Sequence, residues 1–474
     1  MIKSALLTDL YELTMMQGYL LHDRNPEVVF DMFFRRQPFK GGFSVFAGLN
    51  DVLDFLEGLS FTEDELDYLD GLGLFRPLFL DYLKNFQFNG DLYSLEEGTL
   101  VFPDEPLIRI HGNLIETQLV ESLLLNIINF QTLIATKSAR VFLATNKGVI
   151  LEFGLRRAQG PDGALSATRA AFIGGAAATS NTLGGKLLNI PVKGTMAHSW
   201  VMAFSDELEA FRKYAEIFPD STILLIDTYD SLDSGIRNAI KVGLELKEKG
   251  HNNFGIRLDS GDLEYLSKKS RQKLDEAGLA NAKIAVSNEL DEEIIQGLTI
   301  SGAPIDIWGV GTNLVTAGGD SALTGVYKLA AKKSNGIYYP TMKVSNNPSK
   351  VTNPGVKQVY RFYDKSGSPM ADLLTLEDEV LEHGKAHRFY HPMIDYKQMT
   401  LSDYDSFSPL LSLKLGQGKR TQLSSDLQAI QTRMKQNLDS LDPTFKRLKN
   451  PHVYKISLSE KLKRVKEELL RKYS

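Results

Sequence analysis

His198 is the side chain best placed for chemistry, in the run Lys193-Gly194-Thr195-Met196-Ala197-His198-Ser199-Trp200. The run follows an apolar segment that predicts a short strand, and it leads into a predicted helix. An imidazole held at such a junction can act as a nucleophile, a proton carrier or a metal ligand. A lone histidine there would more often be a core or capping residue. This one is accompanied by several similar strand-to-loop junctions.

The loop Glu152-Phe153-Gly154-Leu155-Arg156-Arg157-Ala158-Gln159-Gly160 follows another predicted strand. It places the aromatic ring of Phe153 beside the guanidiniums of Arg156 and Arg157. An aromatic ring can stack on a flat ligand, and a guanidinium pairs well with carboxylate or phosphate. A surface arginine pair with no ligand is an equally good interpretation of this loop taken alone.

A third loop is acidic and has the sequence Ile256-Arg257-Leu258-Asp259-Ser260-Gly261-Asp262. Its carboxylates could hold a hydrated Mg²⁺ or contact ribose hydroxyls. The alternative is an ordinary helix N-cap made by Asp259 or Ser260. The segment Asp227-Thr228-Tyr229-Asp230, after a further predicted strand, adds acids to the same predicted edge.

The fourth loop, Gly309-Val310-Gly311-Thr312-Asn313, offers backbone N–H groups and a hydroxyl suited to phosphate. A tight turn explains it equally well in isolation. Neither a Walker GxxxxGK[ST] motif nor a complete Rossmann fingerprint occurs, nor do the GxSxG and HExxH motifs. His383, His387 and His391 have helical spacing, but Gly384 and Pro392 interrupt them, which disfavours a metal site there.

Strands and helices alternate regularly through the middle of the chain. Hydrophobic periodicity predicts a long helix over 114–145, and helices over 164–178, 199–217, 233–249, 261–277 and 291–301. Strands are expected at 149–153, 190–193, 222–226, 253–257, 283–286 and 305–310. Repeated strand–helix units imply a parallel sheet, and in barrels of this kind the chemistry lies on the loops after the strands.

The expected fold is an irregular or incomplete TIM-like α/β barrel over 126–335. It is accompanied by a mixed α/β domain built from both chain ends, 1–125 with 336–474. The first 110 residues are rich in phenylalanine, and 336–400 contains short strand-like pieces. The tail 443–474 carries many more Lys and Arg than Glu and predicts a solvated helix.

The composition is that of an ordinary globular protein. The chain has 474 residues, of which 24% are charged, and its net charge is -5. No excess of positive charge favours nucleic acid or an acidic membrane surface. The chain has no cysteine, which excludes disulfides and thiolate chemistry. Asp9 interrupts the opening segment before an apolar signal core forms, and no apolar run is long enough to span a bilayer. We therefore expect a cytoplasmic protein without membrane or nucleic-acid partners.

Five motifs in consistent order resemble nicotinate phosphoribosyltransferase, over residues 4 to about 330. They are Thr8-Asp9-Leu10-Tyr11, Glu152-Phe153-Gly154-Leu155-Arg156-Arg157, Gly194-Thr195-Met196-Ala197-His198-Ser199, Arg257-Leu258-Asp259-Ser260-Gly261-Asp262 and Gly309-Val310-Gly311-Thr312. The resemblance implies transfer of phosphoribose from phosphoribosyl pyrophosphate to nicotinate. This pentosyl transfer is the entry step of NAD salvage from nicotinic acid. The family is a homodimer with sites near the subunit interface, and it uses ATP and Mg²⁺.

The same resemblance assigns roles to individual residues. ATP would phosphorylate His198, and hydrolysis of the phosphohistidine would drive the transfer. Phe153 and a partner subunit's Tyr11 would sandwich the pyridine ring. Thr195 and Arg257 would contact nicotinate, with Arg257 on its carboxylate. The remaining assignments are Arg156 and Arg157 to pyrophosphate or the ring carboxylate, Gly311 and Thr312 to the 5-phosphate, and Asp227 and Asp259 to ribose and metal.

Three other interpretations remain open at this point. Nicotinamide phosphoribosyltransferase shares the fold and the chemistry, although an arginine favours the acid over the amide. A barrel aldolase or isomerase acting on a sugar phosphate would need a Schiff-base lysine within a strand or a His/Glu base pair, and Lys193 is the one candidate lysine. A non-catalytic binding barrel is the last alternative.

Overall fold

A computed structural model describes residues 4–473 of the chain, which divide into two compact units. Unit 1 comprises Met1–Leu133 and Ala322–Ser474, and unit 2 comprises Ile134–Ser321. Residues 1–3 and 474, the extreme ends of the expected first domain, lie outside the described residues. The division differs from the expected 126–335 because β12 (Gly325–Ser334) pairs with β1 (Glu27–Phe34), which places 322–335 in unit 1.

Unit 2 contains a six-stranded sheet in the order β7-β6-β11-β10-β9-β8. All its neighbouring strands are parallel. In the described chain no pairing joins the end strands β7 and β8. The strands are β6 (Val149–Glu152), β7 (Ala178–Thr179), β8 (Thr222–Leu225), β9 (Phe254–Leu258), β10 (Lys283–Val286) and β11 (Ile307–Val310).

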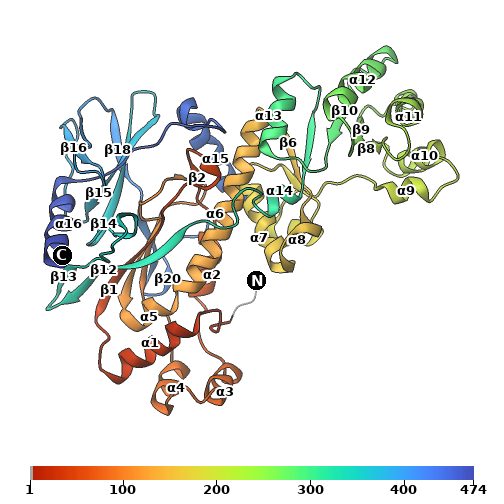
Figure 1. The fold of residues 1–474 in the computed structure, drawn as a ribbon. Helices are drawn as coiled ribbons and strands as arrows, with labels where there is room; N and C mark the ends of the chain where they lie inside the picture. Colours follow the sequence, from red (N-terminus) through yellow and green to blue (C-terminus); the bar gives the residue numbers. More distant parts are fainter. Residues whose placement is uncertain (1–3, 474) are drawn as a thin grey trace. The chain divides into compact units, whose positions relative to one another are not determined.

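Helices separate these strands along the chain, as Figure 1 shows for the yellow and green part of the ribbon. The short apolar strands are buried on both faces, as a parallel sheet requires; Ile150, Ile256 and Ile284 are completely buried. The helices are α7 (Gly160–Ile173), α8 (Thr182–Leu188), α9 (His198–Met202), α10 (Glu207–Ile217), α11 (Ile236–Glu248), α12 (Leu263–Glu276), α13 (Glu292–Ile300) and α14 (Thr312–Val315).

Two predicted helices and one predicted strand of unit 2 differ from the structure. The alanine-rich segment 164–178 ends as a helix at Ile173 and then supplies β7, which the sequence pattern concealed. The predicted helix 199–217 is divided into α9 and α10, because the side chain of Asp206 caps a new helix by accepting from the Glu209 N–H. The predicted strand 190–193 amounts to one parallel bridge, between Thr179 and Val192.

Unit 1 is a mixed α/β structure built from both ends of the chain. A seven-stranded sheet has the order β13-β12-β1-β5-β3-β19-β20, a six-stranded sheet has the order β17-β16-β21-β15-β14-β18, and β2 pairs with β4. The remaining strands are β2 (Ser44–Val45), β3 (Asp91–Ser94), β4 (Leu100–Val101), β5 (Ile108–Asn113), β13 (Ile337–Pro340), β14 (Lys357–Tyr363), β15 (Pro369–Leu376), β16 (His387–Tyr390), β17 (Gln398–Leu401), β18 (Ser406–Pro409), β19 (Ser412–Gly416), β20 (Lys419–Arg420) and β21 (Ile456–Leu458).

The helices of unit 1 are α1 (Leu10–Leu21), α2 (Leu49–Leu56), α3 (Glu63–Gly71), α4 (Pro77–Lys84), α5 (Leu114–Leu119), α15 (Leu427–Ser440) and α16 (Glu460–Tyr473). The long helix α6 (Glu121–Ala144) begins in unit 1 and ends in unit 2. Across the described chain, every helix is too short or too polar to cross a lipid bilayer.

The basic C-terminal tail is more than a solvated helix. Lys466, on α16, is buried and donates to Asn353 Oδ1 at 2.8 Å and to the Pro392 carbonyl at 2.9 Å. The histidines near residue 387 also have individual structural roles. His387 lies in β16, and the Nδ1 of His391 accepts from the Met393 and Ile394 N–H groups.

Candidate active site

One cavity of about 470 Å³ opens among the loops that follow the strands of unit 2. Its walls come from the loops after β6, β7, β9, β10 and β11, and from the segment before α9. In a parallel sheet these loops share one edge, which is why residues far apart in sequence meet there. The lining residues are Phe153, Leu155, Arg156, Arg157, Ser180, Gly194, Thr195, Met196, Ala197, Arg257, Asp259, Ser287, Asn288, Glu289, Gly309, Gly311 and Thr312.

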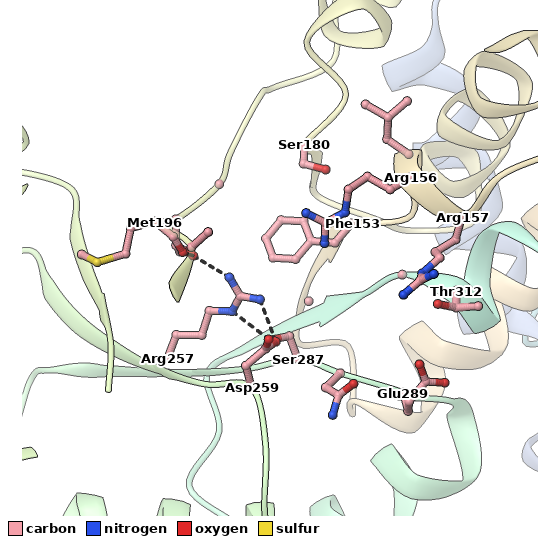
Figure 2. Close-up of a pocket in the computed structure, with 17 residues that line it drawn as sticks. Phe153, Arg156, Arg157, Ser180, Met196, Arg257, Asp259, Ser287, Glu289 and Thr312 are labelled. Atoms are coloured by element: carbon pink, nitrogen blue, oxygen red, sulfur yellow. Dashed lines mark hydrogen bonds and ion pairs between the residues drawn. The ribbon is translucent and has the colours of Figure 1, made fainter. Parts of the chain in front are cut away.

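The guanidinium of Arg257 is held by three acceptors in this cavity (Figure 2). Its Nη1 donates to Thr195 Oγ1 at 2.8 Å, its Nε to Ser287 Oγ at 2.8 Å, and its Nη2 to Asp259 Oδ1 at 2.7 Å. A guanidinium has five N–H donors. Within the described residues, two of these donors have no acceptor, and they belong to a cation whose position is fixed.

The ring of Phe153 forms the wall of the cavity next to that guanidinium. The Arg257 Cζ lies 5.6 Å from the ring centroid. The ring owes its position to Gly309, where a Cβ atom would lie 2.7 Å from the Phe153 Cδ2. A flat aromatic surface and a fixed cation thus stand side by side, which suits a planar anion.

His198 begins α9, beside the cavity, and its side chain is 39% exposed. Its Nδ1 lies 3.1 Å from the hydroxyl of Thr228. Its Nε2 faces two carboxylates, at 3.7 Å from Asp259 Oδ2 and 3.9 Å from Asp227 Oδ1. The predicted strand-to-helix junction therefore brings this imidazole to the acids of two neighbouring loops.

Asp227 has an unusual environment for a carboxylate. Its side chain is only 1% exposed, and its Oδ2 accepts from the Asp259 N–H at 2.8 Å and from Ser260 Oγ at 2.7 Å. Its Oδ1 accepts no hydrogen bond from any residue in 4–473. A buried carboxylate oxygen without a donor is costly unless a ligand satisfies it.

The N-cap alternative for the acidic loop is wrong in its choice of residue. Asp262, not Asp259 or Ser260, caps α12 by accepting from the Tyr265 N–H at 3.0 Å. The positive φ of Gly261 turns the chain between the two acids. Asp259 is thereby left free to face Arg257 and His198.

The four residues expected to bind phosphate also line the cavity. Arg156 and Arg157 lie exposed on a single turn of 3-10 helix directly after Phe153, and Figure 2 shows both side chains along one wall. Gly311 and Thr312 lie where β11 leads into α14. A Cβ at Gly311 would come 3.1 Å from the Phe153 carbonyl, so this close approach also favours glycine.

Tyr11 is the one predicted site residue that lies in unit 1, near the start of α1. It is 43% exposed. Desolvation of its hydroxyl, followed by the charges of Glu121 and Glu12, raises the pKa of Tyr11 above its ordinary value. Its phenol is therefore neutral at physiological pH and presents an aromatic surface to solvent.

Several lining residues escaped the sequence analysis. Ser287, Asn288 and Glu289 directly follow β10, a strand that was predicted, so the rule used for the other loops would have found them. Ser180 follows β7, which was mistaken for helix. Thr228 stood in a quoted segment, but nothing in its spacing pointed to His198.

Comparisons with known proteins agree with this geometry. Residues 6–129 match the family model described as the nicotinate phosphoribosyltransferase (NAPRTase) N-terminal domain, and residues 356–466 match the corresponding C-terminal domain. The chain is 44% identical over 461 residues to the nicotinate phosphoribosyltransferase of Bacillus subtilis, covering 96% of this chain and 93% of that protein. It is 34% identical over 516 residues to the human enzyme of the same name, covering 96% and 95%.

Solved structures extend the likeness to three dimensions. The crystal structure of human nicotinic acid phosphoribosyltransferase superposes with a TM-score of 0.85 at 31% identity, covering 98% of this chain and 99% of that one. A nicotinate-nucleotide pyrophosphorylase from Pyrococcus furiosus superposes with a TM-score of 0.70 at 22% identity, covering 92% and 95%, which supports the fold alone.

Proposed function

The chain belongs to the nicotinate phosphoribosyltransferase family, and on this premise we propose that the cavity of unit 2 is its active centre. The enzyme transfers the phosphoribosyl group of phosphoribosyl pyrophosphate to nicotinate. The products are nicotinate mononucleotide and pyrophosphate, and the reaction serves NAD salvage.

The observation that carries the proposal is the fixed Arg257 guanidinium beside the Phe153 ring. The pyridine ring stacks on Phe153, and its carboxylate accepts the two N–H donors that Arg257 keeps free. Thr195 borders the same subsite through its hydrogen bond to Arg257. This holds the ring nitrogen in one orientation, and alignment of a nucleophile is a large part of the catalysis of such displacements.

The activated sugar occupies the side of the cavity with the phosphate-binding residues. Displacement at the anomeric carbon passes through an oxocarbenium-like state, so charge builds up on the departing pyrophosphate. Arg156 and Arg157 neutralise that charge, or serve the pyridine carboxylate, and Gly311 and Thr312 hold the 5-phosphate. Asp259 faces the ribose.

His198 couples ATP to the transfer. Its imidazole takes the γ-phosphoryl group from ATP and releases ADP, and water later cleaves the phosphorus–nitrogen bond to give phosphate. The phosphoryl group adds about two negative charges beside Asp227 and Asp259, by analogy with other phosphorylated side chains. That charge disturbs the loops after β8 and β9, and in this way phosphorylation changes the affinity for substrate.

The residues present fit a magnesium ion. The buried Asp227 Oδ1 accepts no hydrogen bond within the described residues, and hard cations prefer carboxylate oxygen. Within 4–473 no group of three or more His, Asp or Glu side chains forms a metal cage. Asp227 and Asp259 would hold the ion beside the pyrophosphate. Bound there, it would neutralise charge on the leaving group.

Four further features belong to the same proposal. Unit 2 is an incomplete TIM-like barrel, because its parallel strands alternate with helices and the cavity opens on the loops after the strands.

The chain acts as a homodimer in which the partner's Tyr11 covers the pyridine ring; the exposure of Tyr11 supports this role. The two units are the functional domains. The enzyme works in the cytoplasm, in keeping with a chain that lacks cysteine.

The experiment that tests the function compares nicotinate with nicotinamide as acceptors, using phosphoribosyl pyrophosphate and ATP, and measures the mononucleotide formed. We expect product from the acid and little from the amide, because a fixed guanidinium pairs with a carboxylate. Preference for the amide would support the nicotinamide enzyme instead. The aldolase alternative loses its candidate lysine, since Lys193 is exposed and lies in a loop.

The coupling step is tested with His198→Asn, which retains a polar side chain but cannot be phosphorylated in the same way. We expect loss of the stimulation by ATP, with slow ATP-independent transfer remaining. The measurement is the initial rate of nicotinate mononucleotide formation with and without ATP. An ATP stimulation equal to that of the unmodified chain would remove His198 from this role.

A further inference from the structure

Ser287 connects two charged groups of the cavity, Arg257 and Asp259, and has no part in the proposed mechanism. Its hydroxyl contacts the Nε of Arg257 at 2.8 Å and also forms a short hydrogen bond with Asp259 Oδ1. Arginine can only donate, so the Ser287 oxygen accepts from Arg257 and its single O–H must donate to Asp259. The relay therefore has one direction, from guanidinium through hydroxyl to carboxylate.

This relay blocks a competing arrangement of Arg257 and Asp259. In unit 1, Arg361 donates from both Nε and Nη2 to the two oxygens of Asp372, at 2.9 Å and 2.7 Å. That paired geometry is the usual one for arginine and carboxylate. In the cavity, Ser287 occupies the Nε of Arg257, so Asp259 receives Nη2 alone.

We propose that Ser287 is a positioning residue that keeps Arg257 from closing into a two-bond pair with Asp259, and so preserves the specificity for a pyridine carboxylate. Without the hydroxyl, the guanidinium is free to turn its Nε edge toward Asp259. Its remaining donors then leave the orientation in which they meet the carboxylate. The inference rests on the proposed function, because it assumes that Arg257 binds nicotinate.

The backbone holds Ser287 firmly enough for this task. The residue is 3% exposed, and its N–H donates to the Leu258 carbonyl at 3.0 Å. The hydroxyl is thus fixed between Arg257 and Asp259.

Ser287 also determines which oxygen of Asp259 faces His198. Oδ1 accepts from both Ser287 and Arg257, whereas Oδ2 is the oxygen 3.7 Å from the His198 Nε2. Loss of the hydroxyl therefore disturbs the acid-binding side of the cavity first, and the ribose side less. This distinguishes a positioning role from a general loss of folding.

The test uses Ser287→Ala in the full chain, with calorimetric titration of nicotinate and steady-state kinetics. We expect the nicotinate Kd and KM to rise by about tenfold, the range for a hydrogen bond to a charged group. The KM for phosphoribosyl pyrophosphate should rise less than that for nicotinate, and the Tm should stay near that of the unmodified chain. The preference for nicotinate over nicotinamide should fall.

Two further variants make the result decisive. Ser267→Ala removes another buried hydroxyl of unit 2, one that donates to the Glu264 carbonyl at 3.1 Å away from the cavity, and should change none of these values. Ser287→Thr restores a hydroxyl and should recover the nicotinate affinity.

The proposal is overturned if Ser287→Ala keeps the original affinity and selectivity. It is also overturned if that variant weakens nicotinate, nicotinamide and phosphoribosyl pyrophosphate equally while lowering the Tm, because this is the signature of a structural role. If the unmodified chain forms no nicotinate mononucleotide at all, the proposed function fails, and the role of Ser287 fails with it.

Discussion

Each of the two units contains an arginine–aspartate pair at a sheet. The two pairs differ in how many hydrogen bonds join them and in how exposed they are. In unit 1, Arg361 and Asp372 are joined by two hydrogen bonds, and their side chains are 2% and 0% exposed. Asp372 also accepts from the Tyr454 hydroxyl at 2.9 Å. In unit 2, Arg257 and Asp259 share one hydrogen bond, and their side chains are 16% and 28% exposed.

The difference shows that access for a ligand, not residue type, separates a structural pair from one that can bind substrate. In unit 1 the carboxylate binds the guanidinium through both of its oxygens, and both side chains are shielded from solvent, so a ligand cannot reach them. Arg257 instead divides its donors among three acceptors and retains two. The cavity accordingly offers hydrogen-bonding groups that a ligand can reach, and the buried Asp227 Oδ1 beside it accepts no hydrogen bond within the described residues.

The largest expected effect comes from breaking the buried Arg361–Asp372 pair of unit 1. Asp372→Ala leaves the Arg361 guanidinium buried without its carboxylate, and we expect a loss of about 3–5 kcal/mol in the free energy of unfolding. The nicotinate KM of the folded fraction should not change. Denaturant unfolding measures the first quantity and steady-state kinetics the second.

Asp378→Ala is the matched control in the same unit, because Asp378 pairs with Lys461 at the surface, where the two side chains are 71% and 38% exposed. Exposed pairs contribute little, so its unfolding free energy should change by less than about 1 kcal/mol. Equal losses for the two variants would contradict the distinction between the two kinds of pair.

The Arg257–Asp259 pair of unit 2 should show the reverse pattern, with a large loss of binding and little loss of stability. Arg257→Ala removes the donors assigned to the nicotinate carboxylate, and we expect nicotinate binding to weaken by about 1–3 kcal/mol. Stability should change little, because Asp259 remains partly exposed. Calorimetric titration is the measurement, and an unaltered nicotinate affinity would exclude Arg257 from carboxylate binding.

A smaller effect concerns the pH dependence of the stability of unit 1. Burial, followed by the charges of Arg109 and Lys333, lowers the pKa of His111 to about 3. The unfolded chain takes up a proton near the ordinary histidine pKa while folded His111 stays neutral. Stability from this group is thus complete above that pKa and declines as pH falls toward about 3.

His111→Phe isolates this contribution. Between about pH 7.5 and about pH 5.5, the unmodified chain should lose about 1.4 kcal/mol of unfolding free energy relative to the variant. Denaturant titrations of both proteins across that range provide the measurement. Parallel pH curves would show that His111 is not held neutral in the fold.

The regular parts of the fold were predictable because they depend on local pattern. Short apolar segments bounded by turns marked β8, β9, β10 and β11, and the helices between them followed from hydrophobic periodicity. β7 was missed because it is only two residues long, Ala178 and Thr179, and follows an alanine-rich stretch that looks the same in a helix and in a buried strand. The break between α9 and α10 depends on the Asp206 cap, which competes with an otherwise continuous helical pattern.

The sequence by itself determined which chemistry the chain can perform. Its motifs identify the family, and the strand–helix rhythm brings the loops with Phe153, His198, Arg257 and Thr312 to one edge, since parallel strands end on the same side. Only the tertiary structure decided that Asp262 caps a helix while Asp259 stays available, and that Ser287 and Thr228 touch the reactive groups. The cap depends on which of three neighbouring polar residues reaches the first turn of α12, and the Ser287 and Thr228 contacts join residues about thirty positions apart, which spacing along the chain does not encode.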